Sequence, residues 1–203
     1  MKVSFFLGIG LTLCLYCLLG ERPLPPDQLM TYLQTPEHGL RKSRQVGPLR
    51  VDLQYQPTAM VIANELRQKQ IERSQFETRA QQLEGLQYYR LRLSVDEVGS
   101  DITTYELRDA QEEQERLYYY SFKMRDDIRL VDGGDTLAPV LYHFERSYDL
   151  ADHRTFVLAF ECPPSKSTTT KTFILEPEYF LTGAIKLKIK AEDIQNIPTL
   201  KLL

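Results

Sequence analysis

A histidine and a glutamate stand two positions apart in the stretch "YHFE", residues 142–145. Successive side chains of a β-strand point to opposite faces, so His143 and Glu145 would share one face. An imidazole beside a carboxylate can bind a metal ion or transfer protons, which is the chemistry of a hydrolase-type or metal-dependent enzyme. The same alternation also arises from packing alone, because it directs Tyr142 and Phe144 toward the core. We favour packing and predict no catalytic residue, no metal ligand and no cofactor.

Other residues that could do chemistry lack the spacing that it requires. His38 and His153 are not spaced from each other, or from His143, as metal ligands on one helix would be. Cys162 precedes two prolines, and no signature of a catalytic thiol flanks it. The sequence also contains no phosphate-binding glycine loop, no GxSxG and no HExxH motif.

Clustered tyrosines suggest a different kind of chemistry, the binding of sugars or peptides. The run "YYY" occupies residues 118–120. Tyrosine offers a large contact area and a polar hydroxyl group, but it also completes many protein cores. On a helix Tyr120 would face inward, which leaves Tyr118 or Tyr119 for an exposed surface. This alternative predicts an adhesin or a carbohydrate-binding protein.

Two cysteines at the start of the chain point to lipid attachment. Residues 3–20 carry no charge and follow Lys2, which is the pattern of an export signal. Cys14 and Cys17 lie near the end of this apolar run, where a bacterial lipoprotein carries the cysteine that is acylated. Cys17 is closer to the polar part of the chain and is our predicted attachment site, with Cys14 as the alternative. The N-terminal segment could also stay in the membrane as a transmembrane helix, or be cleaved as a secretory signal.

The composition suits a folded domain held outside the cytoplasm. The chain has 203 residues, of which 42% are hydrophobic and 26% charged, so it can build a substantial core. Its net charge of −3 argues against a nucleic-acid partner. We expect a signal or lipoprotein segment at 1–17, a proline-rich tether at 18–26, and a single β-rich domain with helical insertions at 27–203.

The elements that must position these residues are mostly strands. Period-two alternation predicts strands within 46–57 and 86–95, with Arg50, Asp52, Gln54 and Gln56 of the first in water. Gly133–Gly134 predicts a hairpin turn between strands 127–131 and 136–147. Further strands are expected in three stretches: 155–161, 171–177 and 183–193. Helices are expected at 27–34, at 58–83 with an exposed or looped middle, and at 109–124 with Leu117, Tyr120 and Met124 facing the core.

This pattern predicts an α+β fold that is mainly β. Many short strands separated by turns favour an antiparallel β-sandwich, and the immunoglobulin-like fold is one form of it. The lack of a regular β-α-β order argues against a doubly wound parallel sheet. The apolar strand at 155–161 should lie near the middle of a sheet, and Lys186, Lys188 and Lys190 should line one solvated face.

Three blocks resemble a family of small exported bacterial lipoproteins. They are "GLRKSRQVGPLRVDLQYQPTAMVIANEL", "LVDGGDTLAPVLYHFERSYDLADHRTFVLAFE" and "GAIKLKIKAEDIQNIPTLKL". The resemblance covers most of residues 26–201. It implies an acylated cysteine shortly before "PLPP", which matches Cys17, although the bulky Tyr16 before it departs from the usual pattern. It implies no enzymatic activity.

The sequence therefore predicts a non-enzymatic binding or assembly protein of the cell envelope. Its N-terminus would be attached to a lipid membrane on the periplasmic or outer side, with secretion as the alternative. Its partner would be another protein of the envelope.

Overall fold

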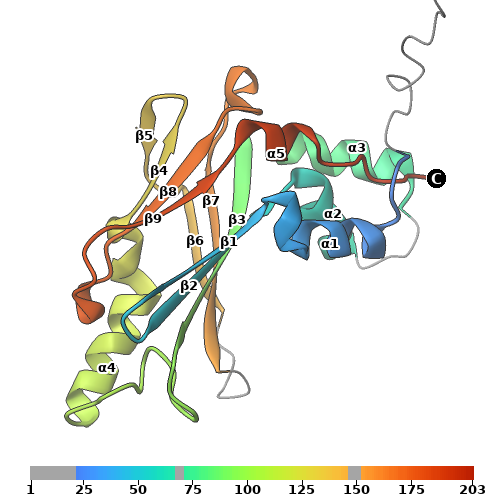
Figure 1. Ribbon diagram of the computed structural model, residues 1–203. Helices are drawn as coiled ribbons and strands as arrows, with labels where there is room; N and C mark the ends of the chain where they lie inside the picture. Colours follow the sequence, from blue (N-terminus) through green and yellow to red (C-terminus); the bar gives the residue numbers. More distant parts are fainter. Residues whose placement is uncertain (1–21, 67–70, 146–151) are drawn as a thin grey trace, which may run out of the picture.

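The computed structural model describes residues 22–66, 71–145 and 152–203, which form two antiparallel sheets with helices at both ends (Figure 1). The strands of the five-stranded sheet are, in spatial order, β1 (Arg41–Val46), β2 (Leu49–Gln56), β3 (Leu86–Val95), β7 (His153–Glu161) and β6 (Leu141–Glu145). Those of the four-stranded sheet are β5 (Asp135–Leu137), β4 (Ile128–Asp132), β8 (Lys171–Leu175) and β9 (Ile185–Ile189). The prediction of a mainly β, α+β fold is confirmed.

The order of the strands is that of an immunoglobulin-like sandwich with one added edge strand. Strands β2-β3-β7-β6 follow the ABED order of that fold, and β5-β4-β8-β9 follow the order C′CFG. Strand β1 extends the first sheet beyond β2. Strand β7 lies between β3 and β6, as its apolar sequence predicts.

One apolar core fills the space between the sheets. Alternate residues of each strand point into it, which is why period-two segments of the sequence became strands. These residues are almost fully buried: Leu49, Val51, Leu53, Leu91, Leu93, Phe156, Leu158, Leu130, Phe173, Leu175, Leu187 and Ile189. On the outside of the four-stranded sheet, Lys186 and Lys188 of edge strand β9 are exposed, as predicted.

Four helices gather at one end of the sandwich: α1 (Pro26–Gln34), α2 (Thr58–Leu66), α3 (Arg73–Gln82) and α5 (Ala191–Gln195) (Figure 1). Leu24 pairs with Leu200 there, and its backbone N–H donates to the carbonyl of Thr199 at 2.9 Å. The described part of the predicted 18–26 tether is therefore attached to the C-terminal tail from Leu24 onward. We call this end of the molecule the proximal end. No helix within 22–66, 71–145 and 152–203 is long and apolar enough to cross a bilayer.

Helix α4 (Ala110–Tyr118) lies at the opposite, distal end and continues into a π-helical turn at Tyr119–Lys123. Tyr120 and Met124 are fully buried, as predicted, but Leu117 is 40% exposed. Instead Arg116 of α4 is buried and donates to Glu112 at 2.7 Å. The inward face of α4 thus carries an ion pair, which a pattern of apolar residues could not predict.

The structure differs from the predicted elements in three places. The strand expected at 183–193 ends at Ile189, and Ala191–Gln195 form helix α5 instead. The strand expected at 136–147 is divided, because the chain leaves the four-stranded sheet after β5 and enters the five-stranded sheet as β6. Strand β1 was missed, because "RKSRQV" is too polar to suggest a strand. It is an edge strand, where such a sequence discourages pairing with other chains.

Candidate binding hollow on the five-stranded sheet

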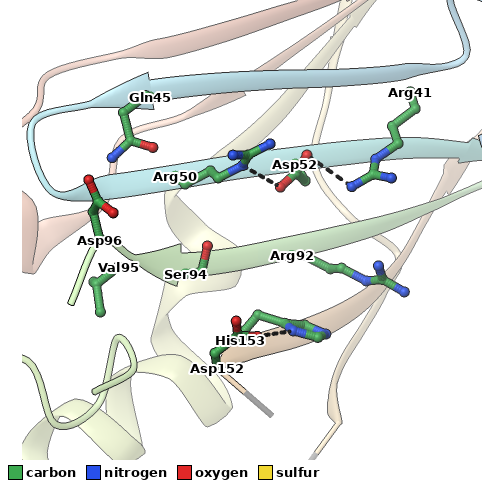
Figure 2. Close-up of a pocket in the computed structure, with 10 residues that line it drawn as sticks. All are labelled: Arg41, Gln45, Arg50, Asp52, Arg92, Ser94, Val95, Asp96, Asp152 and His153. Atoms are coloured by element: carbon green, nitrogen blue, oxygen red, sulfur yellow. Dashed lines mark hydrogen bonds and ion pairs between the residues drawn. The ribbon is translucent and has the colours of Figure 1, made fainter. Parts of the chain in front are cut away.

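The outer face of the five-stranded sheet carries a polar hollow of about 610 Å³. It lies over β1, β2, β3 and the start of β7 (Figure 2). We call it the outer hollow. Its lining residues are Arg41, Gln45, Arg50, Asp52, Arg92, Ser94, Val95, Asp96, Asp152 and His153. Because its floor consists of hydrogen-bonded strands, these side chains extend from a rigid base.

The strand register places four arginines around one carboxylate. Asp52 of β2 lies opposite Arg92 of β3, and Arg50 is two residues away on the same strand face. Arg41 and Arg90 flank Gln54, the next residue of β2 on this face. Asp52 accepts from Arg41 Nη2 at 3.3 Å and from Arg50 Nε at 3.1 Å (Figure 2).

Arg92 lies opposite Asp52 but makes no hydrogen bond or ion pair with a carboxylate among the described residues. Its Nε is inaccessible to solvent and makes no hydrogen bond with any described residue. Burial lowers the pKa of the Arg92 guanidinium, and repulsion from Arg90 and Arg41 lowers it further, against the attraction of Asp52. Within the described part of the chain, Arg90 makes only a long ion pair, 4.0 Å to Glu145. Among the residues that the structure describes, the arginines at this end of the hollow therefore outnumber the carboxylates that pair with them.

The distal end of the hollow is acidic. Asp96 follows β3, and Asp152 precedes β7 with its side chain 90% exposed. His153 Nδ1 lies 3.0 Å from Asp152 Oδ1, and this hydrogen bond lowers the pKa of Asp152. Figure 2 shows the guanidinium groups of Arg41 and Arg92 at one end and Asp96 at the other. The hollow is therefore polarised along its length.

The pair predicted from "YHFE" shares this outer face but lies outside the hollow. His143 is exposed on edge strand β6, while Phe144 is buried and stacks on Phe156 with ring centroids 5.0 Å apart. Tyr142 packs on the same ring at 5.8 Å, so the two aromatics face the core as predicted. Within the described ranges, no three His, Cys, Asp or Glu side chains are grouped as metal ligands would be.

Only one tyrosine of the run at 118–120 is exposed. Tyr118 is 56% exposed, and its ring lies 5.4 Å from that of Phe122 at an angle of 49°. Tyr119 is 3% exposed and donates from its hydroxyl group to Asp127 at 2.6 Å. Tyr119 and Tyr120, both buried, are the first two residues of the π-helical turn at Tyr119–Lys123.

Two further residues considered from the sequence, Cys162 and His38, lie apart from the hollow. Cys162 is partly buried at the proximal end and lines a separate pocket with Tyr55. Burial raises the pKa of its thiol, against the attraction of Lys171. His38 stacks on Tyr32 with centroids 3.6 Å apart. Cys14 and Cys17 lie outside the described residues.

The residues of the hollow were not recognised as a site from the sequence. The alternation predicts Arg50 and Asp52 on a solvated strand face and Arg92 on the face of its strand opposite the apolar residues. All three lie on the outer face of the sheet, although Asp52 is only 13% exposed, and nothing local indicated that the two strands are neighbours. The available signal was the repeated arginine on the polar face of both strands. Arg41 could not be included, because β1 itself was missed.

No family model, curated protein or solved structure matches this chain.

Proposed function

We propose that the chain is a non-enzymatic binding protein held at a membrane outside the cytoplasm, and that the outer hollow is the surface that recognises its partner. The hollow carries this proposal, because it combines a rigid floor with polar and arginine side chains open to a partner. Arginine is enriched at protein interfaces, whose rims are polar and wet. The export pattern of residues 3–20 and the two cysteines near the end of this stretch support the membrane location.

The position of the tether fits this function. The chain enters the domain at Leu24, beside the C-terminal tail at the proximal end (Figure 1). The strands of the five-stranded sheet lead away from that end, and the hollow extends over them to Asp96 at their distal end. A domain attached through residues before Leu24 would hold the hollow at its side, within reach of a second envelope protein. Tethering would also raise the local concentration of the domain near that protein.

Two measurements test the proposal. The first is the mass of the N-terminal peptide from full-length protein made in a lipoprotein-competent bacterium, together with the cell fraction that contains the protein. Acylated Cys17 in the membrane fraction is expected. An unmodified N-terminus on a freely soluble protein would contradict the membrane part of the proposal.

The second is site-specific photo-cross-linking in the same cells. A photoreactive residue at Ser94, inside the hollow, is compared with one at Thr172, which lies on the outer face of the four-stranded sheet. Both are small polar residues in strands and both are partly exposed, so they are a matched pair. We expect a discrete cross-linked protein from Ser94 and not from Thr172. Equal cross-linking at both positions, or none at Ser94, would refute the hollow as the recognition surface.

A further inference from the structure

We infer that the outer hollow binds a single carboxylate, supplied by an acidic side chain of the partner protein, through Arg92 together with Arg41. This inference rests on the proposed function and names the chemistry that the hollow would recognise. Three independent features of the hollow lead to it: an excess of guanidinium groups, donors without acceptors, and acids at the opposite end.

The excess of positive charge is confined to the arginines around Asp52. Arg41, Arg50, Arg90 and Arg92 lie around Asp52 on neighbouring strands, and among the described residues the other carboxylate that pairs with one of them is Glu145, 4.0 Å from Arg90. The chain as a whole has a net charge of −3, so this basic cluster is not a sample of a basic surface. Guanidinium groups bind carboxylates through two parallel hydrogen bonds. An added carboxylate would give the Arg92 guanidinium the partner that Asp52 already gives to Arg41 and Arg50.

Two buried N–H donors at this arginine cluster have no acceptor among the described residues. Gln54 is 8% exposed, and its Nε2 makes no hydrogen bond with any described residue; the same is true of Arg92 Nε. Both residues line a small cavity of about 10 Å³, which shares Arg41, Asp52 and Arg92 with the outer hollow. This is about the space of one oxygen atom or water molecule. Buried donors without acceptors are costly, so an oxygen at this point would be stabilising.

The acidic end restricts which anion fits. Asp96 and Asp152 line the same hollow as Arg41 and Arg92. A polyanion that filled the hollow would bring negative charge against these carboxylates, whereas one carboxylate at the arginine end would not. A broad polar hollow also suits a protein segment better than a small molecule, because small-molecule pockets are mostly apolar and enclose their ligand. The occupant is therefore one acidic side chain of a protein.

The test uses a probe that carries one side-chain carboxylate and no other charge, N-acetyl-glutamate α-amide. The ¹⁵N-labelled full chain, in a zwitterionic detergent at low ionic strength, is titrated while the Nε–H signals of Arg92 and Arg41 and the backbone amide of Ser94 are followed by NMR. We expect saturable shifts of all three signals. N-acetyl-glutamine amide, which has the same shape without the charge, should cause none.

Variants locate the binding. Arg92→Gln should weaken binding about tenfold or more, read from Ser94 because the Arg92 signal is lost. Arg92→Lys keeps the positive charge but removes the two parallel N–H donors of the guanidinium group, so it should also weaken binding. Lys188→Gln removes one positive charge from the outer face of the other sheet and should leave binding unchanged. Equal weakening by Arg92→Gln and Lys188→Gln would overturn the inference.

Two further results would also overturn it. One is the absence of saturable shifts at Arg92. The other is tighter binding of inorganic phosphate than of the glutamate probe, which would make the ligand a phosphate group. In either case, cross-linking at Ser94 remains a separate measurement. If it persists, the hollow is still the recognition surface and only the ligand class is wrong; if it is absent, the proposed function fails as well.

Discussion

Removing the charge of Lys171 should destabilise the domain more than most single substitutions. Lys171 of β8 is 1% exposed and lies opposite Asp132 of β4, which is 0% exposed. Lys171 Nζ donates to Asp132 Oδ2 at 2.7 Å. Gln87 of the facing sheet donates to the same carboxylate at 2.8 Å, and the hydroxyl group of Thr169 donates to its other oxygen. The pair therefore joins the two sheets and the loop before β8 at the proximal end of the core.

The expected magnitude follows from what each substitution leaves behind. Lys171→Met leaves the buried carboxylate of Asp132 without its counter-ion, although two neutral donors remain. Removing one partner of a buried pair in this way costs about 3–5 kcal/mol. Asp132→Asn leaves the ammonium of Lys171 buried and should cost a similar amount. In the double variant the new side-chain amide would still accept from Gln87, and no buried charge would remain, so we expect a cost of about 1–2 kcal/mol.

The assay is urea unfolding of the full chain and its variants, analysed as a double-mutant cycle. The two single variants should each lose several kcal/mol, and the double variant should be more stable than either. Lys188→Met, on the exposed face of β9, is the control and should change stability by less than about 0.5 kcal/mol. Single variants as stable as this control, or a double variant whose loss equals the sum of the single losses, would refute the reasoning.

Three further predictions concern other described residues. Hydrogen bonds, first from Arg108 and then from Arg116, lower the pKa of Glu112 from 4.5 to about 2. The stability that this carboxylate contributes is therefore complete above its ordinary pKa and is lost as pH falls toward 2. Glu112→Gln should make the urea midpoint of unfolding depend less on pH across this acidic range. Asp109 accepts from the backbone N–H of Glu112 at 2.9 Å as the N-cap of α4, so Asp109→Ala should lower the unfolding free energy by about 0.5–2 kcal/mol, and an unchanged urea midpoint would exclude this role. Burial raises the pKa of the Cys162 thiol, so its alkylation by iodoacetamide at mildly alkaline pH, followed by peptide mass spectrometry, should be slower than that of free cysteine; an equal rate would contradict this.

Local patterns predicted most of the strands. In 49–56 and 86–95 the alternation directly reflects which face of the strand is buried, because the side-chain period of two is a property of the strand itself. The turn at Gly133–Gly134 was predicted for a similar reason, since both residues adopt positive φ, of 55° and 94°. Glycine tolerates this conformation regardless of what surrounds it.

Some polar residues could not be placed by the same reasoning. Gln54 and Gln56 alternate with apolar residues and were expected in water, but they are only 8% and 7% exposed. Gln56 lies opposite Tyr88, and this end of the outer face is covered by Ile62 of α2 and by Leu83, which follows α3. The alternation of a strand shows which face a residue is on, but not whether another element covers that face.

The sequence by itself thus determined most of the strands, the core-facing residues within them and the pattern of an export signal, because each depends on neighbours along the chain. Only the tertiary structure decided that Arg41, Arg50 and Arg92 gather around Asp52. Their meeting depends on the register between three strands, one of them a polar edge strand that local pattern did not reveal. That register is set by the packing of the shared core, which no single segment of the chain contains.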